Sequence, residues 1–353
     1  LNLRECNNIT DRICVYHGDA VIGTYIDGEY SKSIPGKNDG YIVDKISCDN
    51  DASASWNNDS WGIVLTNLTR KTKCNVYFET KKPSLSEVII TAMNSNPGMF
   101  ASDDPGKNIR YIGANPDNYI YFNCSDYSNP TADTCELWRI IGVFDGKVKL
   151  IKNTLIGSYS WDNKSTLTGA ETSYGKNDWT TSRLMKLLNP SDYYTVDEND
   201  NNLGQSLYYN SGTGKCYSGQ INATKDCDFT STGIKNDTTR NLIAETTWNL
   251  GGEDSNAVYS NQTYEYERET TVYPGNSTTW TGKIALAYPS DYGYAAEFGT
   301  KYCNQQLNKY SDATCRANNW MKAILGTSTS YSDVWFLTHA SGSSYHAWEL
   351  FSA

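Results

Sequence analysis

LWRIIGVFDGKVKLIK, residues 137–152, carries the clearest structural signal in the chain. Its two apolar, β-branched runs flank Asp145-Gly146, and this dipeptide favours a two-residue type I′ turn because both residues tolerate a positive φ. The segment therefore predicts an antiparallel β-hairpin.

Shorter runs on either side of this hairpin predict further strands and a few short helices. We expect strands at 110–113, 118–122, 283–288, 334–338 and 348–351, and helices at 181–188, 237–246 and 318–325. Long polar loops fill the spaces between them, and loops of this length need tethering. Residues 109–353 are therefore expected to form one α+β domain.

The preceding part of the chain predicts a smaller, all-β module. Three β runs, separated by clusters of Asn, Asp and Ser, lie at 41–48, 61–68 and 73–79. We expect residues 36–80 to form a β-sandwich with Trp56 or Trp61 in its core. Residues 1–35 would be a Cys-closed lead segment, and residues 81–108 a connector with a short helix. The fold class is thus mostly β, a small sandwich followed by an α+β domain.

Composition and charge limit the partners. The 353 residues include 20% charged residues and give a formal net charge of −10. This acidity argues against nucleic acid and anionic membranes, which proteins contact through Lys and Arg patches. No apolar run reaches the roughly 18 residues that span a bilayer. Because residues 1–7 are mostly polar, we expect an export signal or anchor that was removed before Leu1 or was never part of this chain.

Ten cysteines form the strongest local pattern, because they fall into five neighbouring couples. The couples are Cys6 with Cys14, Cys48 with Cys74, Cys124 with Cys135, Cys216 with Cys227, and Cys303 with Cys315. Short loops are easily bridged, and an even count is typical of an oxidising compartment. We expect five disulfides in this sequential pairing, although the sequence alone does not fix the connectivity. Metal binding is the rival interpretation, but no C-x-x-C occurs and only His17 stands near a couple.

Several phrases within residues 110–350 resemble a family of exported surface proteins from Gram-positive gut bacteria. They are Arg110-Tyr-Ile-Gly-Ala-Asn-Pro116, Leu137-Trp-Arg-Ile-Ile-Gly142, Leu184-Met-Lys-Leu-Leu-Asn-Pro190, Thr247-Trp248 with Gly251-Gly252, Ala287-Tyr-Pro-Ser-Asp-Tyr-Gly-Tyr-Ala295 and Trp335-Phe-Leu-Thr338. The resemblance implies a C-type-lectin-like fold over residues 109–353, shared with formylglycine-generating-enzyme relatives and with variable receptor proteins. Residues 36–80 resemble the short immunoglobulin-like module that often precedes it. Such domains imply display and binding rather than a known reaction.

One departure from the family pattern concerns the end of the chain. Family members usually continue to a final Arg-Pro-Ala-Val-Tyr-Leu-like strand, whereas this chain ends at Ala353. An open sheet edge needs covering. Either further residues follow, or a neighbouring subunit inserts a strand, and Ala20-Val-Ile-Gly-Thr-Tyr-Ile26 is the candidate donor.

No catalytic constellation stands out. The three histidines are His17, His339 and His346, and none belongs to a metalloprotease, hydrolase or nucleotide-binding motif. The formylglycine-generating relatives use a late reactive Cys pair, but the polar loop around Cys303 and Cys315 favours a structural bridge. We therefore expect no enzyme.

A structural calcium ion is the one cofactor that the sequence leaves open. Its weak candidate ligands are Asp197, Asn199 and Asn201, whose alternating oxygens are similar to those of a calcium loop. The Gly and Glu that an EF-hand needs are replaced by Asn202 and Tyr208. A solvated polar loop is the plainer alternative.

The last part of the domain is the candidate ligand surface. Its aromatic and small polar residues suit an adaptable contact surface, and in lectin-like receptors this late part binds the ligand. The candidates are Tyr331, Trp335, His339, Tyr345, His346 and Trp348. The plainer alternative places Trp335 and Trp348 in the core.

Two functions follow for an extracellular, cell-surface protein. The first is a structural subunit that self-associates into a filament or layer, favoured by the disulfide couples and the incomplete final sheet. The alternative is a lectin-like adhesin that binds glycan or host protein through the late aromatic loops.

Overall fold

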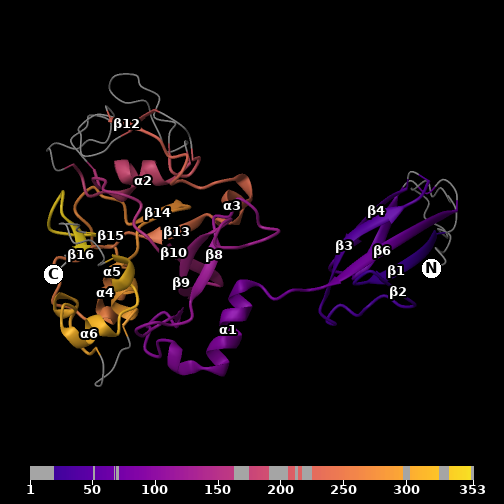
Figure 1. The fold of residues 1–353 in the computed structure, drawn as a ribbon, viewed down its shortest axis with the longest axis horizontal. Helices are drawn as coiled ribbons and strands as arrows, with labels where there is room; N and C mark the ends of the chain where they lie inside the picture. The colour runs from indigo at the N-terminus through magenta and orange to yellow at the C-terminus, as the bar shows by residue number, and fades with distance from the viewer. Residues whose placement is uncertain are drawn as a thin grey trace, which may run out of the picture. The chain divides into compact units, whose positions relative to one another are not determined.

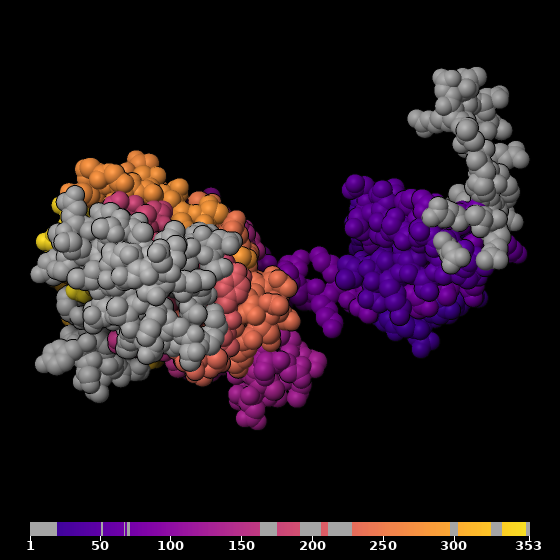
Figure 2. Space-filling model, turned by 90° about the horizontal axis from the view of Figure 1, so that it is seen from above, coloured from indigo at the N-terminus to yellow at the C-terminus, as the bar shows by residue number. Residues whose placement is uncertain are grey.

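The chain divides into two compact, β-rich units, Leu1–Ser84 and Leu85–Ala353. The computed structural model describes residues 20–50, 52–66, 68, 71–162, 175–190, 206–210, 214–216, 225–296, 303–325 and 334–350. Figure 1 gives the ribbon and Figure 2 the space-filling surface, with the first unit in indigo and the second running through orange to yellow. Within the described residues, no helix is long and apolar enough to cross a bilayer.

The first unit is built on one four-stranded sheet and one separate hairpin. Its strands are β1 (Ala20–Ile26), β2 (Glu29–Ser31), β3 (Tyr41–Cys48), β4 (Ser53–Asn57), β5 (Gly62–Thr66) and β6 (Thr72–Thr80). The sheet has the order β2-β1-β6-β3, with β1 parallel and β3 antiparallel to the central β6. Strands β4 and β5 form the hairpin.

The core of the first unit lies on one face of β6. Alternate residues of this strand, Cys74, Val76 and Phe78, are buried, as the two-residue period of a strand requires. Both tryptophans predicted as core candidates pack on the Phe78 ring, Trp56 with a centroid distance of 5.2 Å and Trp61 with 6.1 Å. Each is only half-buried, so the hairpin covers the sheet without closing completely over it.

The segment predicted as a free lead strand belongs to this sheet. Residues Ala20–Ile26 pair with β6 over their whole length, so the boundary expected at residue 35 falls inside the unit and this segment is not free to complement another chain. Gly23 and Thr24 interrupt the apolar residues of this strand, so its sequence alternates only weakly. A Cβ at Gly23 would lie 2.5 Å from Oδ1 of Asn75, so a larger residue there would displace the Asn75 side chain.

The second unit combines short strands with short helices. Its strands are β7 (Ile109–Arg110), β8 (Tyr119–Phe122), β9 (Glu136–Phe144), β10 (Lys147–Lys152), β11 (Gly214–Cys216), β12 (Lys225–Cys227), β13 (Thr246–Asn249), β14 (Thr279–Gly282), β15 (Val334–His339) and β16 (Ala347–Leu350). Its α-helices are α1 (Leu85–Ser95), α2 (Arg183–Leu188), α3 (Asp237–Leu242), α4 (Ser260–Tyr266), α5 (Pro289–Tyr294), α6 (Ala313–Ala317) and α7 (Lys322–Leu325). The connector helix, α1, therefore belongs to the second unit.

The predicted hairpin is the centre of the main sheet. Strands β9 and β10 pair across Asp145 and Gly146, which have φ angles of 48° and 75°, so the type I′ prediction is confirmed. Strands β7 and β8 both add to β9. Gly142 permits the approach of β7, since a Cβ there would lie 1.9 Å from the carbonyl oxygen of Ile109.

The strand expected at 283–288 does not form, and a side chain explains why. The Asn189 amide takes the place of a partner strand, because its Oδ1 accepts from the Ile284 N–H (2.9 Å) and its Nδ2 donates to the Ile284 carbonyl (2.8 Å). The helices expected at 181–188, 237–246 and 318–325 are also shorter, as α2, α3 and α7.

Three of the five expected disulfides fall within the described residues and have the sequential pairing. They are Cys48–Cys74, Cys124–Cys135 and Cys303–Cys315. Three disulfides in the described part of the chain are compatible with an extracellular protein.

The other two expected bridges are not among these three disulfides. Cys6 and Cys14 both lie outside the described residues, which begin at Ala20. Cys216 and Cys227 stand on the paired strands β11 and β12, but their side chains are not described. A bridge between Cys6 and Cys14 and one between Cys216 and Cys227 therefore stay predictions.

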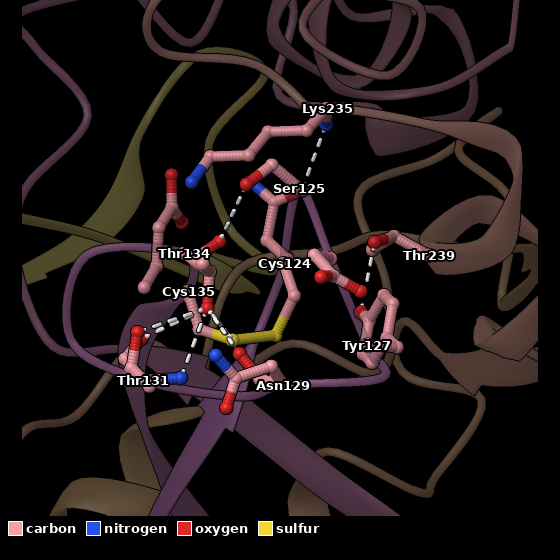
Figure 3. The surroundings of a disulfide bond; sticks show 12 residues. Cys124, Ser125, Tyr127, Asn129, Thr131, Thr134, Cys135, Lys235 and Thr239 are labelled. Atoms are coloured by element: carbon pink, nitrogen blue, oxygen red, sulfur yellow. Dashed lines mark hydrogen bonds between the residues drawn. A yellow bond between two sulfur atoms is a disulfide. The ribbon is translucent and has the colours of Figure 1, made fainter.

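The Cys124–Cys135 bridge closes a loop that internal hydrogen bonds also support, among them one from the Ser125 N–H to the Thr134 carbonyl at 2.7 Å (Figure 3). Thr134 organises the loop, because its hydroxyl donates to the Asn129 carbonyl and accepts from the Thr131 N–H. Outside the loop, the Tyr127 hydroxyl contacts the Thr239 hydroxyl of α3 at 2.8 Å. The disulfide thus holds together a segment that side-chain bonds alone connect to its neighbours.

A buried ionic network joins the elements of the second unit. Arg110 of β7 is 1% exposed, and its guanidinium pairs with Asp104 and, at 2.7 Å, with Asp291 of α5. The Lys149 ammonium of β10 lies 2.5 Å from the other Asp291 oxygen. Burial alone would raise the pKa of Asp291, but the charges of Lys149 and Arg110 hold it below its ordinary value.

We expect Arg110→Met to destabilise the protein by about 3–5 kcal/mol, since it leaves the Asp104 and Asp291 carboxylates short of a buried partner. Chemical denaturation of the full chain measures this. Lys152→Met is the matched control, because its pair with Glu136 is partly exposed and should contribute about 1 kcal/mol or less. Equal losses in the two variants would contradict the central role of Arg110.

Replacing Cys124 and Cys135 together by Ser should lower the free energy of unfolding by about 2–3 kcal/mol, because the reduced unfolded chain gains loop entropy. Denaturant titration under oxidising conditions provides the measurement. Asp133→Ser, an exposed change in the same loop, should have almost no effect. If the variant without both cysteines is as stable as this control, the bridge does not contribute to the free energy of unfolding.

Candidate functional site

A cleft of about 530 Å³ lies in the second unit, between the β15–β16 hairpin and helices α5, α6 and α7. These helices and the hairpin are labelled in Figure 1, apart from α7. Its wall is completed by two further segments, with Glu253, Asp254 and Asn256 after β13 and with Leu307, Asn308, Tyr310 and Ser311 before α6. The volume is within the range of about 300–1,000 Å³ that small-molecule sites occupy.

The floor of the cleft is aromatic. Tyr292, Tyr310 and Phe336 are buried, with the Tyr292 ring 5.8 Å from Tyr310 and 6.1 Å from Phe336. Burial raises the pKa of both Tyr292 and Tyr310 to about 12. The floor is therefore uncharged at any physiological pH.

The rim carries charged and neutral polar groups. The indole N–H of Trp348 donates to the Glu253 carbonyl at 2.8 Å, which ties β16 to the segment after β13. Asp254 accepts from the Gly342 N–H at 2.8 Å and from the Ser341 hydroxyl at 3.2 Å. These bonds fix the turn between β15 and β16 beside the cleft.

One buried asparagine sets the shape of the loop between β15 and β16. The Asn177 side chain donates through Nδ2 to the carbonyls of Ala340 (3.2 Å), Ser343 (2.7 Å) and His346 (2.8 Å). Its own N–H donates to the Ser344 carbonyl at 2.9 Å. Since Asn177 is fully buried, the loop that carries His346 has a defined backbone without being part of a sheet.

The structure divides the predicted ligand residues between two environments. His346 and Trp348 line the cleft, and Tyr345 is exposed beside them with its ring 4.4 Å from that of His346. Trp335 and His339 do not reach the cleft. Tyr331 lies outside the described residues.

The alternation of β15 explains the position of Trp335 and His339. This strand runs between two hydrophobic cores, so Phe336 contributes to the core beside the cleft while Trp335 and Leu337 pack into the other. The indole N–H of Trp335 donates to the Tyr159 carbonyl at 3.1 Å. His339 shares the parity of Trp335 and is 2% exposed, while Trp335 is partly buried against the other core, so neither side chain lines the cleft.

His339 is held as a neutral base. Burial lowers the pKa of His339 to about 4, against the opposing charges of Asp178 and Asp254. Its carbonyl and ring lie close to Gly252, where a Cβ would be 2.8 Å from the His339 carbonyl oxygen. The packing against a glycine leaves no room for a ligand at this imidazole.

Five charged residues of the cleft were not predicted. They are scattered along the sequence, and no spacing rule connects them: Glu253, Asp254, Arg316, Lys322 and Glu349. The Cys303–Cys315 bridge next to Arg316 was the only available signal. The weak calcium candidates Asp197, Asn199 and Asn201 lie outside the described residues, and within the described residues no group of three or more His, Cys, Asp or Glu could hold a metal ion.

Comparison with known proteins adds no relationship. No protein-family model matches the chain, and no curated protein or solved structure matches it significantly. The assignment of function therefore depends on the geometry of the cleft.

His339 should make stability depend on pH. Its folded pKa of about 4 lies below the unfolded value of 6.5, so the unfolded state takes up a proton first and stability is lost as the pH falls from 6.5 towards 4. Between pH 7 and 5, the chain should lose about 2 kcal/mol relative to His339→Gln. Denaturation at the two pH values measures the difference.

Comparing the unchanged chain with His339→Gln cancels the opposing effect that Glu267 has on the pH dependence of stability. Burial raises the pKa of Glu267 to about 7, so this group favours folding more as the pH falls from 7 to 4.5, and it does so in both proteins. His346→Gln, at an exposed position, should keep the full pH dependence. An unchanged pH dependence in His339→Gln would refute the assignment.

Proposed function

We propose that this is an extracellular surface protein that binds a glycan through the cleft of its second unit. The observation that carries the proposal is a cleft whose rim loop is held in one backbone conformation by the buried Asn177. A preorganised rim loses little entropy when it takes up a ligand. The aromatic floor and the polar rim match the apolar ring faces and the hydroxyls of a sugar. The proposal is one of binding without catalysis.

The disulfides support a location outside the cell. Three bridges lie in the described part of the chain, two of them closing short segments, and such bonds persist in oxidising compartments. One of them is next to the cleft, because Cys315 precedes Arg316 on α6.

The resemblance to C-type-lectin-like domains is part of the proposal. Two of the phrases on which it rests, one from Arg110 and one from Ala287 to Ala295, meet through the buried Arg110–Asp291 ion pair. Phrases that meet in this way are consistent with a shared structural core. We propose the same for the first unit, as an immunoglobulin-like module that displays the second.

A structural role as a polymer subunit is the second candidate, and one feature of the first unit favours it. Tyr30, Tyr25, Tyr77 and Lys45 stand opposite one another across all four strands of the sheet. The Tyr25 and Tyr77 rings stack at 4.9 Å, Tyr30 is 65% exposed, and the Lys45 ammonium lies 4.7 Å from the Tyr77 centroid. An aromatic row on an outer sheet face suits contact with another chain.

An array of immobilised oligosaccharides, probed with the full chain, tests the proposed binding. Asn308→Trp should block the rim of the cleft and weaken binding by at least about tenfold, because the indole fills space that the sugar would occupy. Asn304→Trp is the matched control, since Asn304 is exposed nearby but does not line the cleft. An array without any bound glycan, or with equal binding by both variants, overturns the proposal.

Negative-stain microscopy of the native protein separates the second candidate from the first. Long polymers that disappear in Tyr30→Ser would support the subunit role, because that change removes the most exposed ring of the row. Single particles in both proteins would contradict it.

A further inference from the structure

Two cationic side chains in the cleft have no partner in the described part of the chain. Arg316 of α6 and Lys322 of α7 are both half-buried and both line the cleft. No hydrogen bond or ion pair connects either side chain to another described residue. A cation that is partly removed from water without a counter-charge gains from a negatively charged ligand.

The position of Arg316 is fixed by the fold. It follows Cys315, which is fully buried and bridged to Cys303, and α6 begins at a cap in which Asp312 accepts from the Thr314 N–H. Its charge acts on the hydroxyl of Tyr292 at the cleft floor, where it partly offsets the effect of burial on the pKa. Arg316 is half-buried and lines the same cleft as Tyr292, so its charge belongs to the cavity that has the aromatic floor.

Two carboxylates of the cleft are engaged within the protein. Asp254 holds the Ser341–Gly342 turn, and Glu253 accepts from the Ser255 N–H at 2.7 Å. These two acids thus stabilise the rim, while the two cations remain for a ligand.

The neutral part of the rim selects among anions. Asn256, Asn308 and Ser311 offer amide and hydroxyl groups next to the aromatic floor. Amides and hydroxyls match a sugar ring, which carries several hydroxyls around one charged group. A guanidinium binds a carboxylate through two parallel hydrogen bonds, and a nearby ammonium adds a second charge.

We propose that the glycan bound in the cleft carries a carboxylated sugar, a uronic or sialic-type acid, whose carboxylate is held by Arg316 and Lys322. This inference rests on the proposed function and narrows its ligand. The protein has a formal net charge of −10, so its long-range field does not attract the acid. The two cations therefore act at short range and give selectivity for the carboxylate rather than fast association.

The test compares each acid with a neutral copy of itself. Calorimetric titration of the full chain uses oligosaccharides that end in galacturonate, glucuronate or N-acetylneuraminate, each alongside its methyl ester. At least one acid should bind about tenfold more tightly than its ester. This preference should fall to about onefold in Arg316→Gln combined with Lys322→Gln, while the affinity for the ester stays the same.

Lys309→Gln is the control, because Lys309 is exposed beside the cleft but does not line it. It should leave the preference for the acid intact. If no acid is preferred over its ester, or if the preference survives the double change, the inference is wrong. Esters that bind as well as acids, with both lost in Asn308→Trp, would leave the cleft as the glycan site and overturn only the role of the two cations.

Discussion

The carboxylate of Asp291 is the point on which the second unit depends. It accepts from Arg110, from Lys149 and from the Tyr288 N–H, so one fully buried group connects β7, β10 and α5. Burying a charge is costly unless every partner is in place, which makes this arrangement specific to one packing of the three elements. The next residue, Tyr292, forms part of the cleft floor. The ionic network and the candidate site are therefore positioned by the same short helix.

A second constraint comes from side chains that satisfy backbone groups in place of strands. Asn189 bonds both the N–H and the carbonyl of Ile284, and Asn177 bonds three carbonyls of the loop before β16. Long polar loops cannot leave buried backbone groups unpaired. Together with the disulfides, these amides give irregular segments a fixed course where the sheets in the described residues are short.

Features whose interacting residues are close together in the sequence could be predicted, and features that depend on distant residues could not. The hairpin around Asp145-Gly146 was predictable because the turn and both strands lie within sixteen residues. The Cys124–Cys135 and Cys303–Cys315 disulfides were predictable for the same reason, since their partners are 11 and 12 residues apart. The strand at 20–26 pairs with residues about fifty positions later, and the loss of a strand at 283–288 depends on Asn189. Because these interacting residues are far apart in the sequence, no pattern within either segment indicates them.

The candidate site was predicted in part, and its geometry shows why composition alone could not complete it. The late segment is rich in aromatic residues on both faces of β15 and β16, but a strand between two cores sends alternate side chains to opposite sides. His339 is therefore buried and Trp335 packs against the core away from the cleft, whereas His346 and Trp348 line the cleft. Arg316 of α6 and Lys322 of α7 line the same cleft. No spacing of residues in the sequence predicts that they do.

The backbone of the rim loop is held by bonds that do not involve the side chains of the loop. Asn177 contacts this loop through the carbonyls of Ala340, Ser343, Ser344 and His346, groups that every residue type possesses. A side chain such as that of His346 or Tyr345 can then change without loss of the bonds that set the backbone. A binding surface built in this way can alter its ligand contacts while the cleft keeps its form. The demanding positions are the buried ones, Asn177 beneath the loop and Asp291 beneath the floor, because each satisfies several backbone or charged groups at once.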